Sequence, residues 1–228
     1  MLQASTLDFF KELKTNNNKD WFDQNRKRYD KVKADYNNLA SSILKELKVK
    51  DESLDILQPK NCTFRINRDI RFSKDKSPYK TNLGLIFSPF AKRMAVASYY
   101  VHIEEGKCFV GGGLYMPDST LLKKLRNEIN FFHKDLTKIL KDPLFVKTYG
   151  GLDINDRVML KRPPKGYDAN HPAIEYLKLK SFTTGAKIPD DILTTEKLVP
   201  FLIENLSLLQ PMISFINRGL MSNEEGGI

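Results

Sequence analysis

Residues 99–115, YYVHIEEGKCFVGGGLY, decide the fold of this chain. From residue 99 to residue 104, the larger apolar side chains occupy every second position, which is the period expected of a strand with one buried face. The turn residues Glu105-Gly106-Lys107 follow, and residues 108–115 have the composition of a second strand. Two strands joined by so short a connection pair in antiparallel fashion.

Other segments show the same period of two. Residues 63–67 and 83–88 alternate in this way, residues 182–188 have the composition of a last strand, and residues 152–164 have room for one more short strand. We therefore predict an antiparallel β-meander sheet of about four to six strands.

Helical periodicity lies on both sides of these strands. Apolar residues at spacings of three, four and seven predict a helix of almost thirty residues, capped by Asp20 or Asn18, because no Gly or Pro interrupts residues 20–58. Another helix begins after the cap Asp118, and a last helix spans about 194–218 and is stopped by Gly219. Long N-terminal and C-terminal helices packed on an antiparallel sheet make an α+β fold.

The composition is that of a folded protein. The chain has 228 residues, a net charge of +9, 14 Phe, 9 Tyr and one Trp, which is too much apolar surface for a solvated coil. We see no linker or repeat and predict one α+β domain over residues 1–221, with a frayed tail at 222–228. Two cysteines form no disulfide framework in a chain of this length.

No membrane or secretion signal is apparent in the sequence. No uninterrupted apolar run approaches the ~20 residues that cross a bilayer, and the N-terminus lacks the basic start and apolar middle of a signal peptide. We expect a cytoplasmic protein without a membrane partner. The sequence carries no signal for an oligomeric state.

Almost half of the excess positive charge lies in residues 65–80, RINRDIRFSKDKSPYK. Six basic and two acidic residues give this segment a net charge of +4. Guanidinium groups match carboxylate or phosphate through paired hydrogen bonds, and lysine adds a mobile point charge. We therefore predict a site for an anion. The residues assigned to it are Arg65, Arg68, Arg71, Lys74, Lys76, Tyr79 and Lys80, with Lys165 from a second basic group.

Each of these basic groups has a structural interpretation as well. In residues 65–80, the two central arginines would pair with Asp69, Asp75 or a distant Glu as an internal network, and the lysines would remain solvated. Lys165 belongs to a proline-rich loop with Lys161 and Arg162. This loop either folds against the first group, so that six to nine cations face one cleft, or is simply solvated.

Three consecutive glycines, residues 111–113, stand inside a predicted strand, where glycine costs stability. Such a run marks a bulge or the close approach of another backbone or a ligand, and we favour close packing of a helix over the sheet. The run lacks the strand-to-helix setting and the Lys-Ser/Thr ending of a P-loop, which excludes nucleotide binding by that route.

His102 shares a strand face with Tyr100 and Glu104. A histidine beside a carboxylate is a candidate general acid or base, so His102 and Glu104 are the catalytic candidates. A hydrogen-bonded histidine on a partly covered sheet face is the structural alternative. No His, Cys or carboxylate group has metal-ligand spacing, and we predict neither a metal nor a cofactor.

Five segments of the chain resemble one family. They are WFDQNRKRY at 21–29, RDIRFSKDKSPYKTN at 68–82, YYVHIE at 99–104, VGGGLYMP at 110–117 and LKRPPKGYDANHPAIEYLKLKSF at 160–182. Together they are similar to the domain of unknown function 2461, a family of uncharacterised conserved proteins widespread in bacteria. The similarity runs in order from about Leu7 to Arg218, which implies that one family domain occupies nearly the whole chain. The family implies no reaction, ligand or catalytic residue.

Three classes of function fit the sequence. We rank first a binding or catalytic site for a small phosphorylated or carboxylated molecule, in which the cations would stabilise developing negative charge if a reaction occurs. The second is a nucleic-acid-binding module, because Phe72 and Tyr79 beside cations allow stacking and backbone contact. The third is a structural or assembly role for the basic segment. Whether the protein is an enzyme is left open.

Overall fold

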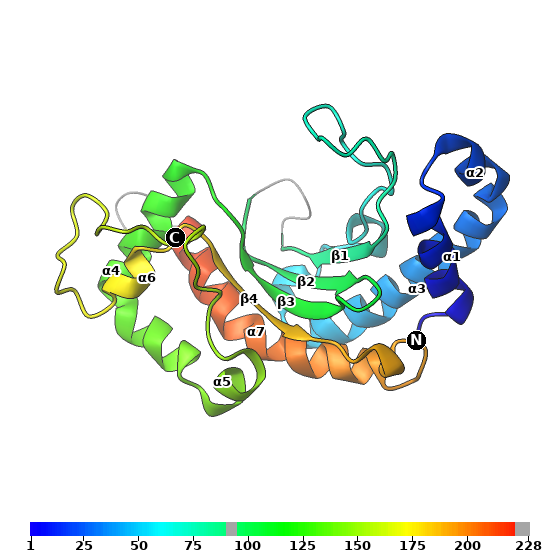
Figure 1. The fold of residues 1–228 in the computed structure, drawn as a ribbon. Helices are drawn as coiled ribbons and strands as arrows, with labels where there is room; N and C mark the ends of the chain where they lie inside the picture. Colours follow the sequence, from blue (N-terminus) through cyan, green and yellow to red (C-terminus); the bar gives the residue numbers. More distant parts are fainter. Residues whose placement is uncertain (90–94, 222–228) are drawn as a thin grey trace. The chain divides into compact units, whose positions relative to one another are not determined.

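The computed structural model describes residues 1–89 and 95–221. It has an α+β architecture with one antiparallel sheet, flanking helices and the strand order β1-β2-β3-β4 (Figure 1). The strands are β1 (Leu83–Phe87), β2 (Ser98–Ile103), β3 (Phe109–Leu114) and β4 (Phe182–Lys187). The predicted fold class is confirmed, at four strands.

Helices account for most of the remaining regular structure. They are α1 (Ala4–Thr15), α2 (Lys19–Gln24), α3 (Arg26–Lys50), α4 (Ser119–Leu140), α5 (Pro143–Tyr149), α6 (Ile174–Leu177) and α7 (Leu198–Met221). As predicted, Asp118 caps α4, since its side chain accepts hydrogen bonds from the N–H groups of Thr120 and Leu121.

Contacts divide the chain into two compact units. The first consists of Met1–Phe87, Tyr100–Val110 and Lys187–Glu204, and the second of Ser88–Tyr99, Gly111–Ala186 and Asn205–Ile228. One domain over 1–221 stays a prediction, because a division by contacts does not measure whether either unit folds alone. The predicted frayed tail, 222–228, lies outside the described residues.

In the first unit, α3 contacts both α1 and β1. The prediction of one uninterrupted helix from Asp20 is wrong, because Asn25 has non-helical dihedral angles (φ −100°, ψ 13°) and separates α2 from α3. The Asn25 side chain donates a hydrogen bond to the carbonyl of Trp21 (2.9 Å), a local alternative to helical geometry that Asn readily adopts. The Asn18 side chain caps α2 by accepting from the N–H of Trp21.

The predicted strand at residues 63–67 is also wrong. It takes part only in isolated bridges, from Thr63 to Leu85 and from Asn67 to Tyr79. The second bridge closes the basic segment on itself, because its two ends pair with each other instead of extending the sheet. The suggested strand in 152–164 likewise amounts to a single bridge, from Met159.

In the second unit, the backbone of β4 lies against the glycine run of β3. A Cβ atom on Gly111 would lie 2.2 Å from the carbonyl oxygen of Thr184, and one on Gly113 would lie 2.0 Å from that of Phe182. We expected a helix to require these glycines, and α7 does approach Gly112 through Leu209. The closest atoms nevertheless belong to neighbouring strands.

Helix α7 runs past its predicted stop at Gly219 and ends at Met221. A Cβ atom on Gly219 would lie 2.6 Å from the Cβ of Glu128, so this glycine allows a close side-chain contact instead of ending the helix. By length and composition, α7 is the one helix in the described part of the chain that is apolar enough to cross a membrane. Core helices pass the same test, and Leu202, Leu206 and several other apolar residues of α7 are buried.

Candidate anion-binding site

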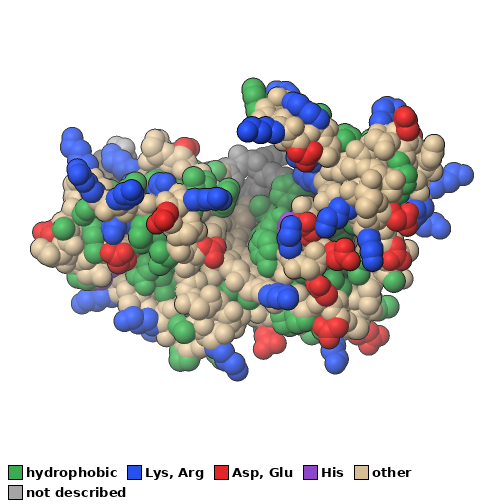
Figure 2. Space-filling model, viewed as in Figure 1, with side chains coloured by type: hydrophobic (Ala, Val, Ile, Leu, Met, Phe, Trp, Pro, Cys, Tyr) green, Lys and Arg blue, Asp and Glu red, His purple; other side chains and the backbone are tan. Residues whose placement is uncertain are grey.

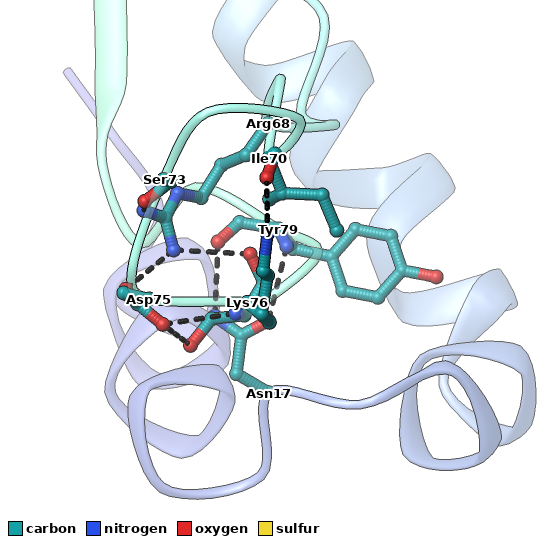
Figure 3. A network of polar contacts seen from close by, with 8 residues as sticks. Asn17, Arg68, Ile70, Ser73, Asp75, Lys76 and Tyr79 are labelled. Carbon is teal, nitrogen blue, oxygen red and sulfur yellow. Dashed lines mark hydrogen bonds and ion pairs between the residues drawn. The ribbon is translucent and has the colours of Figure 1, made fainter.

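The basic segment 65–80 forms a loop between α3 and β1 that carries an internal ion pair (Figure 3). The Arg68 guanidinium donates to the carboxylate of Asp75 and, at 3.0 Å, to the carbonyl of Ser77. The hydroxyl and N–H of Ser77 also donate to Asp75, at 2.6 and 2.9 Å. These bonds from Ser77, together with Arg68, lower the pKa of Asp75 from 3.8 to about 2. Much of the hydrogen-bonding capacity of the Arg68 guanidinium is thus used within the loop.

A second ion pair joins Arg71 to Asp69. The guanidinium donates through Nε and Nη2 to the two carboxylate oxygens, at 2.9 and 2.7 Å. The hydrogen bonds from Arg71 lower the pKa of Asp69. The side chain of Arg71 is 76% exposed, whereas that of Asp69 is 46% exposed and also lines the cavity at the base of the loop. Both arginines that we placed at the centre of the ligand site therefore have an acidic partner within the loop.

The outer end of the loop is basic and aromatic. Figure 2 shows Lys and Arg side chains gathered there with a hydrophobic side chain. Phe72 is 95% exposed, and the guanidinium of Arg71 lies 5.8 Å from its ring centroid. Lys76 donates to the carbonyl of Ile70, whereas Lys74 is exposed.

The base of the same loop borders a cavity of about 420 Å³ within the first unit. We call this cavity the cationic hollow, and its basic lining residues are Lys33, Arg65, Arg68 and Lys80. Its aromatic lining residues are Phe10, Tyr29, Tyr36, Phe64 and Tyr100. A neighbouring cavity of about 490 Å³ shares Lys33 and Arg65 with it, so the two cavities adjoin at these residues.

Three of the four cations in the hollow have no acidic partner. Throughout residues 1–89 and 95–221, no hydrogen bond or ion pair joins Lys33, Arg65 or Lys80 to a carboxylate. The ammonium nitrogen of Lys80 lies 5.2 Å from the ring centroid of Phe64. Burial, and secondarily the charge of Arg65, lower the pKa of Lys80. One carboxylate, that of Asp69, also lines the hollow, where the charge of Arg65 contributes to lowering its pKa, but its hydrogen bonds go to Arg71. Among the described lining residues, four basic side chains therefore face one acidic side chain.

The structure brings together only some of the predicted ligand residues. Arg65, Arg68 and Lys80 line the hollow, and Tyr79 lines the neighbouring cavity, whereas Arg71, Lys74 and Lys76 line neither. Lys165 belongs to the second unit, and its participation stays a prediction.

The sequence analysis did not include Lys33 among the ligand residues, although it lines the hollow. A signal for it was present, because Lys33 lies four residues after Tyr29 and three before Tyr36, and such spacing puts all three on one helix face. All three line the cationic hollow.

The catalytic candidates form a hydrogen-bonded chain on β2 and the residue after it. The Nδ1 atom of His102 lies 3.2 Å from the hydroxyl of Tyr100, and its Nε2 atom lies 3.3 Å from a carboxylate oxygen of Glu104. The imidazole also stacks on Phe109, with ring centroids 5.0 Å apart. Burial raises the pKa of Glu104, but the bond to His102 and the charge of Lys107 outweigh it, so the net pKa is lowered. Of the three members, Tyr100 lines the hollow.

Both cysteines, Cys62 and Cys108, are buried as free thiols. Burial raises the pKa of Cys108 to about 11, which disfavours a reactive thiolate. In the described residues, no group of three or more His, Cys, Asp or Glu side chains is placed to hold a metal ion.

Comparison with known protein families matches residues 5–215 to the family described as "Conserved hypothetical protein (DUF2461)". No curated protein matches the chain, and no solved structure matches it. The family match covers all five segments that carried the resemblance in the sequence. The chain therefore belongs to the domain of unknown function 2461 family.

Proposed function

We propose that the first unit binds a small phosphorylated or carboxylated molecule in the cationic hollow. One observation carries the proposal: Lys33, Arg65 and Lys80 come from α3 and from the two ends of the basic loop, yet they line one cavity. The acidic residue in the described lining of that cavity, Asp69, is already paired with Arg71. Like charges held this close repel one another, and an anion between them would relieve that repulsion.

The other lining residues indicate what kind of anion fits. Arg65 supplies a planar guanidinium that binds two oxygens of a phosphate or carboxylate at once, and Lys33 and Lys80 supply point charges. The rings of Phe64 and Tyr100 give the hollow an apolar wall. About 420 Å³ lies within the usual range of small-molecule sites. These features favour a compact anion with a flat or apolar body.

Ligand screening with matched variants tests the proposal. We expect some members of a panel of phosphate esters, nucleotides and carboxylates to raise the melting temperature of the wild-type protein. The variants Arg65→Ala and Lys80→Ala should weaken binding of the same compounds by about tenfold or more each, since hydrogen bonds to charged groups contribute about 1.5–3 kcal/mol.

Lys74→Ala is the matched control, because it removes one positive charge from the same loop without touching the hollow. It should leave the affinity of these compounds within about twofold, given that exposed charges in solvent are largely screened. If no compound binds, or if Lys74→Ala weakens binding as much as Arg65→Ala does, the hollow is not the site.

Nucleic-acid binding is the second candidate, favoured by the exposure of Phe72 at the outer end of the loop. Arg71 lies beside that ring and Lys74 is exposed nearby, an arrangement that suits base stacking together with phosphate contacts. In that case binding to single-stranded DNA or RNA should fall steeply with salt. Phe72→Ala should weaken it, and Arg65→Ala should weaken it less. No binding at low salt would rule this candidate out.

A further inference from the structure

The chain Tyr100–His102–Glu104 leads from the hollow to the half-buried carboxylate of Glu104. The side chains of His102 and Glu104 are only 15% and 17% exposed, whereas the Tyr100 ring lines the hollow itself. Among these three groups, Tyr100 is thus the one that a bound molecule would meet. His102 lies behind it, at 3.2 Å from its hydroxyl.

We propose that Tyr100 exchanges a proton with the molecule bound in the cationic hollow, and that His102 and Glu104 position and relay that proton. This inference rests on the proposed function, because it assumes that an anion occupies the hollow. It goes further by making the hollow a site of acid–base chemistry and by assigning each group a role. Tyr100 is the group in contact with the bound molecule, and His102 and Glu104 are positioning residues.

The hydrogen bonds define one consistent protonation state. The Glu104 carboxylate can only accept, so the Nε2–H of His102 donates to it. Nδ1 of the neutral imidazole is then the acceptor and receives the hydrogen bond of the Tyr100 hydroxyl. The order is carboxylate, imidazole and hydroxyl, the same logic by which a histidine base activates a serine.

The proton balance of the step is simple. A hydroxyl or carbon acid of the bound molecule gives its proton to the Tyr100 oxygen, while the Tyr100 proton moves to Nδ1 of His102. The resulting imidazolium is stabilised by the Glu104 carboxylate, and the anion formed on the bound molecule is stabilised by Arg65 and Lys80. No electron is gained or lost. The substrate class is thus a phosphorylated or carboxylated compound that carries an ionisable hydroxyl or carbon acid.

The backbone beneath the Tyr100 ring is shaped to receive it. A Cβ atom on Gly84 would lie 2.8 Å from the Tyr100 hydroxyl oxygen and 3.2 Å from the ring of Phe64. Any other residue at position 84 would therefore displace the hydroxyl. The hydroxyl of Tyr36 donates to the carbonyl of Gly84 and so helps to fix the backbone against which the Tyr100 hydroxyl lies.

A carboxylated electrophile tests the inference without knowledge of the natural ligand. The probe is 4-(fluorosulfonyl)benzoate, whose carboxylate suits the cations of the hollow and whose sulfonyl fluoride reacts with phenols. The Tyr100 oxygen attacks sulfur, the S–O bond forms, the S–F bond breaks, fluoride leaves, and the phenol proton passes to His102. Labelling is followed by intact mass and located by peptide mapping. Tyr100→Phe should abolish it, and Tyr115→Phe, which changes an exposed tyrosine that does not line the hollow, should not.

The variants separate binding from proton transfer. We expect labelling to saturate with probe concentration and inorganic phosphate to compete with it. Arg65→Ala should raise the half-saturating concentration. His102→Gln and the isosteric Glu104→Gln should instead lower the maximal rate with little change in that concentration, for His102→Gln by about 100-fold, the lower end of what a positioned base contributes. Glu104→Gln serves if His102→Gln does not fold.

The possible labelling results distinguish the proton relay from the anion site. Saturable labelling of Tyr100 that depends on His102 or Glu104 supports the inference. Saturable labelling with unchanged maximal rates in both variants would overturn the relay and leave the proposed anion site standing. Labelling of Tyr100 that does not saturate, or no labelling of Tyr100, would overturn the inference, and the thermal-shift screen then shows whether the anion site fails with it.

Discussion

The side chain of Asn17 forms two hydrogen bonds with the backbone of Tyr79, 62 positions further along the chain (Figure 3). Its Nδ2 donates to the Tyr79 carbonyl at 2.9 Å, and its Oδ1 accepts from the Tyr79 N–H at 3.0 Å. The ring of Tyr79 stacks on Phe22, with centroids 4.0 Å apart. The turn after α1 therefore anchors the base of the loop whose ends line the cationic hollow.

Asn17→Ala should destabilise the protein by about 2 kcal/mol, because it leaves the partly buried N–H and carbonyl of Tyr79 without their partner. Urea unfolding measures the change. The control is Asn16→Ala, whose exposed side chain bonds only to Glu12 and Thr15 at the end of its own helix. It should cost less than about 1 kcal/mol. Equal effects of the two variants would contradict the anchoring role of Asn17.

The Asp75 carboxyl should titrate with a pKa of about 2 in a carbon-detected NMR titration. This value lies below the 3.8 of an unperturbed Asp, so the bonds from Ser77 and Arg68 contribute their full stability above pH 3.8 and lose it as the pH falls toward 2. Ser77→Ala should move the pKa up toward 3.8, whereas Ser73→Ala, which removes only a long contact to Arg68, should not. An unchanged pKa in Ser77→Ala would contradict the assignment.

The pKa of Lys80 should rise when Arg65 is replaced by Ala. Burial lowers this pKa first and the charge of Arg65 lowers it further, so removal of that charge relieves part of the effect. A bound phosphate should raise the same pKa, because an adjacent anion favours the charged ammonium. NMR of isotopically labelled lysine side chains measures both changes. Arg71→Ala is the control, and a rise of equal size there would show that general charge, not the neighbouring guanidinium, is responsible.

Gly113→Ala should prevent folding or destabilise the protein by more than about 4 kcal/mol. Gly113 combines a positive φ of 120° with a carbonyl oxygen of β4 at 2.0 Å from the place of a Cβ. Gly106→Ala isolates the first of these effects, since Gly106 also has a positive φ, of 72°, but no atom within 4 Å. It should cost about 1–2 kcal/mol. The melting temperatures of the two variants, measured by calorimetry, give the stability that each one loses. A similar loss in both variants would contradict the close approach of β4 to Gly113.

Local signals were enough to predict much of the fold. The alternation around Val101 and the glycine turn after Glu105 predicted β2 and β3, and Asp118 predicted the start of α4, because strand period and helix capping depend on neighbours in sequence. The two wrong predictions of where a helix is interrupted or ends both involve a side-chain contact that apolar periodicity does not report. Asn25 breaks a helix through one side-chain hydrogen bond, and Gly219 fits beneath Glu128 instead of ending α7.

The amino-acid sequence by itself determined the fold class, the family and the basic character of residues 65–80, since these follow from periodicity, motif and composition. Only the tertiary structure decided which cations have an acidic partner. It pairs Arg68 with Asp75 and Arg71 with Asp69, and it brings Lys33 from α3 beside Arg65 and Lys80. The physical reason is that charge is a property of each residue, whereas its neutralisation depends on distances between side chains that are far apart in the chain.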